Sequence, residues 1–534
     1  MLVAILMLAG AVISAITFQT MKNPEYSNWQ GYDAEWKVVD SLENQGLPES
    51  ALKAVETIYT FAKGDKNDEQ LIKAVIYKAK YINMVQEDAQ VKAINLFAQE
   101  TEWATGVTKS IFQNLLAEIY WSYYQNNRWK FSGRSTTVDF KNDDISTWDV
   151  KSLHQKTYDL YVASIQNREE LKKVKINKYS AILIEGDAYG KMLRPTVYDF
   201  LAHRTLDFLM NDEAYITEPA YSFKMDKPVL FGSNKAFAGY VFNGDNDSSK
   251  KLLALHILQD LTIAHLYDPQ PAALIDIDIK RLSFAKNNAV NLDADSLYLN
   301  ALVAEEKLYS KDSSSTRISH LIATEHYSKG TNYQPLAGDE FKWENKIALD
   351  ICNAAIAAFP NSLGAKNCAA LKITIQQKEY SITAERVNVP DKPFRAGVSF
   401  KNVDTLLFKL VKISSEEMSR VEAMEYDVKF AELEKFPVVK SWNQPLPVDG
   451  DYQQHFTEVK IDALPLGSYY LIASENAKFI NTSNKLIAQE IWISNLSYIA
   501  SGNDYNNAPN KDFYVLDRTT GKPISGATIQ TYRK

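Results

Sequence analysis

The hydrophobic period of this chain changes at about Tyr380, and that change constrains the fold more than any other feature. Before Tyr380, apolar side chains recur every three or four residues, which is typical of amphipathic helices. After it, apolar and polar residues alternate in short runs between Pro, Gly, Asp and Asn, which is typical of β-strands. We therefore predict an α+β chain in which a helical region precedes antiparallel strands.

The first part of the helical region contains paired helical patterns. In AEWKVVDSLENQGLPESALKAVETIYTFAKG, apolar residues recur at helical spacing on both sides of QGLPES, where Gly46 ends one helix and Pro48 opens the next. We predict αα-hairpins of a tetratricopeptide-like or α-solenoid repeat over residues 30–130. Residues 131–380 are expected to form a more irregular helical region with similar pairs near its end.

The alternating runs after Tyr380 predict two β-domains. Residues 381–506 contain several such runs separated by turns, which is typical of an antiparallel β-sandwich. Residues 511–534, DFYVLDRTTGKPISGATIQTYRK from Asp512 onward, have the pattern of strand, tight turn and strand. Because an isolated hairpin of this size is only marginally stable, we expect this stretch to begin a second, truncated β-sandwich.

The N-terminus predicts export. Residues 2–16 are almost entirely apolar, too few to favour a membrane-spanning helix, and a small-residue pattern offers a cleavage site after Ala15. We assign residues 1–17 as a signal peptide, with a single N-terminal anchor helix as the alternative. No cysteine follows the apolar run, so a lipoprotein is not expected. The predicted location is the periplasm, cell envelope or surface, near a membrane but not spanning it after cleavage.

Charge and motif content argue against nucleic-acid binding and catalysis. The net charge is −7, whereas phosphate backbones require concentrated Lys and Arg. The histidine pairs 256/265 and 320/326 lack the spacing of four that places two imidazoles on one metal ion. Asp276 and Asp278 form only a weak carboxylate pair. We therefore predict no enzyme activity, no cofactor and no metal site.

The two cysteines, Cys352 and Cys368, flank Pro360 at eight residues each. If Pro360 lies in the turn between antiparallel helices, the two side chains face one another. They could then be bridged in an oxidising compartment, or they could be two small buried core residues. Two cysteines are too few for a structural zinc site.

Three stretches of the β-region carry a family resemblance. These are the strand end FKNV at 400–403, the strand entry LPLGSYY at 464–470, and the turn DRTTGKPISGA at 517–527. They resemble the first macroglobulin domains of bacterial alpha-2-macroglobulin-like proteins, although the last pattern also occurs in carboxypeptidase-regulatory-like β-sandwiches. The structural residues of these motifs are Asn402, Gly467, Tyr469, Asp517, Gly521, Pro523 and Gly526.

The resemblance implies a secreted or periplasmic, non-enzymatic protein that engages proteases. Family members carry a bait segment and often a Cys-x-Glu-Gln thioester that captures the attacking protease. Neither cysteine has that context, since Cys352 precedes Asn-Ala-Ala and Cys368 precedes Ala-Ala-Leu. The resemblance places any thioester beyond Lys534.

Two functions follow as hypotheses. In the first, the chain is the N-terminal fragment of an exported alpha-2-macroglobulin-like protein, the non-catalytic scaffold of a broad-range protease inhibitor. Its partners are proteases, which would be engaged by the part beyond this sequence, and its helical repeats either bind a further protein or pack against later domains. In the alternative, the helices and a regulatory-like β-sandwich form a binding or uptake scaffold of an envelope transport system.

Overall fold

Helices occupy the chain from Tyr32 to Gln376 and strands follow from Glu379, so the predicted α+β order is confirmed. The computed structural model describes residues 29–131, 145–183, 188–215, 223–243, 249–479, 485–501 and 512–530. The predicted signal peptide, residues 1–17, lies outside these ranges, as do residues 502–511 before the predicted second β-domain. None of the helices within them is long and apolar enough to cross a membrane.

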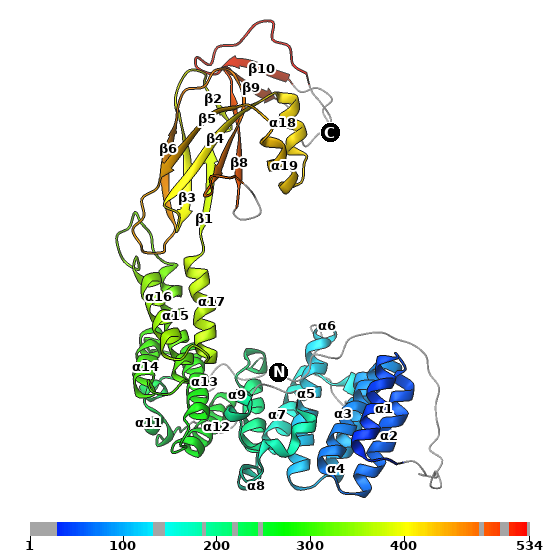
Figure 1. The fold of residues 1–534 in the computed structure, drawn as a ribbon. Helices are drawn as coiled ribbons and strands as arrows, with labels where there is room; N and C mark the ends of the chain where they lie inside the picture. Colours follow the sequence, from blue (N-terminus) through cyan, green and yellow to red (C-terminus); the bar gives the residue numbers. More distant parts are fainter. Residues whose placement is uncertain are drawn as a thin grey trace. The chain divides into compact units, whose positions relative to one another are not determined.

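The chain divides into two compact units, Met1–Asp312 and Ser313–Lys534. The first unit is helical (Figure 1). Its α-helices are α1 (Tyr32–Asn44), α2 (Pro48–Gly64), α3 (Asp68–Val85), α4 (Ala89–Trp103), α5 (Gly106–Asn126), α6 (Arg128–Phe131), α7 (Val150–Ser164), α8 (Arg168–Lys173), α9 (Ala188–Leu193), α10 (Val197–Leu209), α11 (Asn234–Ala238), α12 (Lys250–His265), α13 (Ala272–Asn288) and α14 (Ala294–Leu308). Short 3₁₀ helices occupy Ile145–Thr147, Ile176–Ile182, Asp212–Tyr215 and Pro228–Phe231.

Consecutive helices pack on each other from α1 to α5, and α5 packs on α7. The predicted hairpin of α1 and α2 forms, with Gly46 at φ 71° after α1 and Pro48 in the first turn of α2. Trp36 and Val39 of α1 meet Val55 and Ile58 of α2 in one buried cluster, because their spacing places them on facing sides of the two helices.

The second unit begins with three helices, α15 (Ser315–Gly330), α16 (Glu344–Ala358) and α17 (Leu363–Gln376), which pack on one another. The strands follow as β1 (Glu379–Ala384), β2 (Val387–Asn388), β3 (Phe394–Lys401), β4 (Thr405–Ile413), β5 (Val438–Pro445), β6 (His455–Ile461), β7 (Gly467–Ser474), β8 (Ile487–Ile493), β9 (Leu496–Ser501) and β10 (Asp512–Asp517). Two short helices, α18 (Ser415–Glu422) and α19 (Tyr426–Leu433), interrupt the strands.

The strands form a three-stranded sheet, β1-β3-β6, and a five-stranded sheet, β2-β8-β7-β4-β5. All their pairings are antiparallel except β2 with β8. Val398 of β3, Phe408 of β4 and Leu471 of β7 belong to one buried cluster, so the two sheets share a core. Tyr470 and Ile472, which alternate with Leu471, point to the opposite face of β7 and pack beneath α18 and α19.

Strand β9 leaves the five-stranded sheet and pairs with β10 in a two-stranded sheet. The sequence pattern places β9 within the 381–506 domain and β10 after it, whereas hydrogen bonds join the two strands. The break falls at Ser494 and Asn495, between β8 and β9. After β10, the expected second strand is reduced to a single bridge between Leu516 and Pro523.

Candidate functional site

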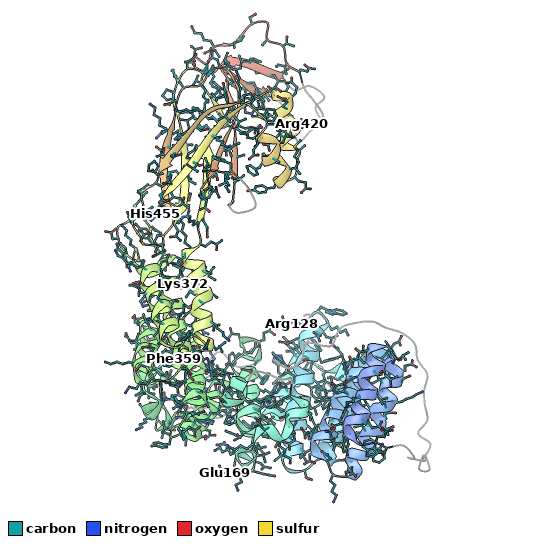
Figure 2. All side chains as sticks on the ribbon, viewed as in Figure 1. Arg128, Glu169, Phe359, Lys372, Arg420 and His455 are labelled. Carbon is teal, nitrogen blue, oxygen red and sulfur yellow. The ribbon has the colours of Figure 1, made fainter. Side chains whose placement is uncertain are left out.

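The loop between β5 and β6 brings two carboxylates and an imidazole together. Asp449, Asp451 and His455 each offer one ligand atom, and these atoms all lie within 4.8 Å of one another. Gly450 at φ 71° and Tyr452 at φ 60° fold the loop so that its start approaches the first residue of β6. His455 lies at the end of the sheets next to α16 (Figure 2).

The central carboxylate of this cluster is buried. Asp451 is 2% exposed, and its Oδ1 accepts hydrogen bonds from the backbone N–H of Gln453 at 3.0 Å and from His455 Nε2 at 2.9 Å. Its Oδ2 is buried and has no hydrogen-bond partner among the described residues. A buried carboxylate oxygen without a partner is costly, because it has lost its hydration.

Four polar contacts fasten this loop to the segment that opens α16. Lys342 Nζ lies 2.9 Å from Asp449 Oδ2, and Asn345 donates from Nδ2 to the carbonyl of Tyr452 at 2.8 Å. Gln453 Nε2 donates to the carbonyls of residues 341 and 342 at 3.2 and 3.3 Å. The hydrogen bond from Lys342 and its charge lower the pKa of the Asp449 carboxyl. The loop therefore joins the helical part of the second unit to its sheets.

This cluster was not predicted from the sequence. The spacing between histidines does not reveal it, because the cluster contains one histidine, and its two acids precede that histidine by six and four residues. The pattern Asp-x-Asp-x-x-x-His is visible in the sequence and could have been found by counting carboxylates near each histidine. Nothing in that pattern alone gives the backbone conformation that brings the three side chains together.

Asp276 and Asp278 lie on α13 and have separate partners. Asp276 pairs with Arg194 at 2.6 Å, and Asp278 pairs with the buried Arg281, which also donates to the carbonyls of residues 230 and 232. Beside them, burial and then the charge of Asp278 raise the pKa of Glu305 well above its ordinary value. We interpret this buried group as a structural ionic cluster.

The histidine pairs do not form shared sites. His265 Nε2 lies 3.0 Å from Asp199 Oδ1 and its Nδ1 lies 2.6 Å from Asp268 Oδ2, while His256 is exposed on the same helix. Burial alone would lower the pKa of His265, but the two carboxylates leave it above the ordinary value. Asp199 also accepts from Thr196 in the capping box of α10, so its role is structural.

The remaining pair lies in the second unit. His320 is half-buried, and His326 Nδ1 lies 2.5 Å from Glu344 Oε2. Burial lowers the pKa of His320. The partner of His326 is thus a residue at the start of α16 and not the neighbouring histidine on α15.

Cys352 of α16 and Cys368 of α17 are buried and face one another in one apolar cluster. Pro360 lies in the turn between their helices, as expected. Both are free thiols, and the hydrogen bond between them lowers the pKa of Cys352 and raises that of Cys368. The pair is therefore close without being bridged in this structure.

The first two family motifs lie at junctions between elements. Asn402 follows β3 at φ 57° and donates from Nδ2 to the carbonyls of Ile375 at 2.8 Å and Gln377 at 3.0 Å, at the end of α17. Gly467 opens β7 at φ 150°, and Tyr469 donates its hydroxyl hydrogen to the carbonyl of Pro465 at 2.9 Å. Both motifs fix where a central strand begins or ends.

The third motif forms the turn after β10. Asp517 accepts hydrogen bonds from the backbone N–H groups of Thr519 at 3.1 Å and Thr520 at 2.8 Å, and bonds to Thr520 lower the pKa of its carboxyl. Gly521 and Gly526 both adopt positive φ, and Pro523 bridges to β10. These residues shape the turn through its backbone angles and hydrogen bonds.

No family model matches the sequence, and no curated protein matches it.

Proposed function

We propose that this chain supplies the N-terminal, non-catalytic scaffold of an exported alpha-2-macroglobulin-like protease trap. The observation that carries the proposal is the entry of β7, where Gly467 of the Leu-Pro-x-Gly-x-Tyr motif adopts φ 150° and Tyr469 donates back to the carbonyl of Pro465. This arrangement gives the resemblance a structural role at the centre of the five-stranded sheet.

We further infer that the two sheets with a shared core are a macroglobulin-type β-sandwich. Their antiparallel pairing and common apolar cluster support that inference. The β9–β10 pair with its Asp517 turn would begin the next sandwich. The consecutive packing of α1 to α5 supports an irregular helical repeat. We propose that this repeat either binds a further protein or packs against later domains.

The absence of catalysis is part of the proposal. The polar clusters described above are explained by helix capping, ion pairing or a candidate ligand site. In a trap of this kind, capture is started by the protease, which cleaves the bait segment. The scaffold then needs stability and correct domain placement, and it needs no active-site residues of its own.

The test uses the full-length protein mixed with a fluorescently labelled protease and separated by size. We expect the active protease to co-elute with the protein, because its own cleavage starts capture. The same protease blocked at its active site is the control and should elute alone. Equal co-elution of both forms would point to an ordinary binding scaffold, as in the transport alternative, and elution of both forms alone would contradict the proposal.

A further inference from the structure

We propose that Asp449, Asp451 and His455 bind a divalent transition-metal ion, for which Zn²⁺ is the best-suited candidate, at the loop between β5 and β6, which contacts the start of α16. The proposal is independent of the protease-trap function. It is based on three donor side chains within reach of one ion and on a buried carboxylate oxygen that lacks a partner.

The donor atoms are close enough for a single ion. They lie within 4.8 Å of one another. Because zinc binds nitrogen and carboxylate oxygen at about 2.0–2.2 Å, donors around one ion are roughly 3–4 Å apart. Side-chain rotation covers the difference, since Asp449 is exposed at the loop surface and His455 is only partly buried.

The second observation is the orphaned oxygen of Asp451. Its Oδ1 already accepts from Gln453 and His455, whereas Oδ2 is buried with no partner among the described residues. Lys342 pairs with Oδ2 of Asp449, so Oδ1 of that carboxylate can coordinate an ion. A bound cation would supply the missing partner of the buried carboxylate.

The donor types select the ion. One imidazole and two carboxylates suit zinc, which commonly takes three protein ligands and keeps one position for water. Calcium prefers six to eight oxygen ligands, and an imidazole nitrogen does not suit it.

The nearest rival for zinc in the second unit is the thiol pair of Cys352 and Cys368, because thiolates also bind zinc. This pair lies inside an apolar cluster between α16 and α17. A variant with both cysteines replaced by serine therefore removes the rival site and keeps all three proposed ligands. Tyr452 of the loop packs against the same apolar cluster, so circular dichroism must show that this variant keeps its fold.

The test is calorimetric titration of the metal-free chain with ZnCl₂. We expect one saturable equivalent in the wild type and in C352S/C368S. Asp449→Asn and His455→Gln should each weaken binding at least tenfold. The matched control is Asp350→Asn, because Asp350 is also an exposed acid in the second unit that pairs with a lysine. This control should bind as the wild type does.

Three results would overturn the proposal. They are the absence of saturable binding in the wild type, unchanged affinity in both Asp449→Asn and His455→Gln, and loss of binding only in the cysteine variant. If circular dichroism shows that His455→Gln does not fold, the affinity of Asp449→Asn decides the test. The Asp449 side chain is exposed, so its replacement should leave the fold intact. At equal concentration, zinc should also raise the melting temperature of the wild type more than that of Asp449→Asn.

Discussion

Asn402 closes the last turn of α17 with its side chain and begins the β3–β4 connection with its backbone. Its amide donates to two carbonyls at the end of the helix, and its φ of 57° lies in the left-handed region that Asn tolerates better than most residues. Terminal carbonyls of a helix have no partner within it. One residue thus satisfies the helix end and turns the chain between two strands.

Asn402→Ala should destabilise the second unit by about 2–3 kcal/mol, from two lost hydrogen bonds and a strained backbone. Asn402→Gly loses the same bonds but relieves the strain, so it should recover about 1 kcal/mol. Urea unfolding followed by circular dichroism measures both variants. If both variants were as stable as the wild type, the hydrogen bonds of Asn402 to the end of α17 would contribute nothing to stability.

Glu305 makes the stability of the first unit decline as pH rises above about 4.5. Its native pKa is raised well above the ordinary value of about 4.5, first by burial and then by Asp278. Above pH 4.5 the unfolded chain therefore loses a proton that the native chain keeps. Because the native state binds more protons, this contribution to stability declines as pH rises from 4.5 to the native pKa.

Glu305→Gln cannot ionise and still offers a hydrogen-bond donor. We expect this variant to be more stable than the wild type at pH 8 and to show a flatter dependence of stability on pH between 5 and 8. The control is Glu102→Gln, a change to an exposed side chain of α4 in the same unit. Urea unfolding across this range measures the slopes, and parallel slopes for wild type and Glu305→Gln would contradict the account.

At the residue scale, the sequence predicted structural positions where a motif requires an unusual backbone angle. Gly467 and Asn402 were singled out from motifs, and both adopt positive φ. The Asp449–His455 cluster was missed because its geometry depends on Tyr452 at φ 60°. Tyrosine has no preference for that region, so the turn is imposed by the contacts of the loop with α16.

Close packing of the helices in the second unit depends on Gly364 of α17. A Cβ added there would lie 2.1 Å from the backbone carbon of Thr316 and 2.3 Å from the nitrogen of Arg317, both in α15. A backbone neighbour cannot rotate away as a side chain can. The crossing of α15 and α17 is therefore possible only with glycine at this position.

Gly364→Ala should force α15 and α17 apart and cost about 1–3 kcal/mol, the usual range for overpacking. The matched control is Gly64→Ala at the end of α2, where an added Cβ meets nothing within 4 Å. That change should be neutral or stabilising by up to about 1 kcal/mol, since alanine favours helix. Thermal unfolding measures the melting temperatures of both variants. Equal changes in melting temperature would contradict the packing argument.

Elements were predictable where the periodic run was long. The hairpin of α1 and α2 and the strands from β1 to β4 follow their patterns. The helices α18 and α19 were missed, because each has only eight residues and lies between strong strand patterns. The pairing of β9 with β10, outside the five-stranded sheet, was also missed. The alternation of apolar and polar residues along a strand does not indicate which strand it pairs with.

At the scale of the whole molecule, the boundary between compact units does not coincide with the change of hydrophobic period. Helices α15 to α17 belong to the unit that contains the strands. Hydrophobic period identifies the type of an element, whereas unit boundaries depend on which elements share contacts. Here those contacts include Asn402 with the end of α17 and the 449–455 loop with the start of α16.

The central claim, that this chain is the scaffold of a protease trap, is tested most directly by substrate size. A protease incubated with the full-length protein is assayed on a small peptide and on casein. The account predicts that peptide cleavage persists while casein cleavage falls at least tenfold, because a trapped protease admits only small substrates. Retention of both activities, or an equal loss of both, would contradict it.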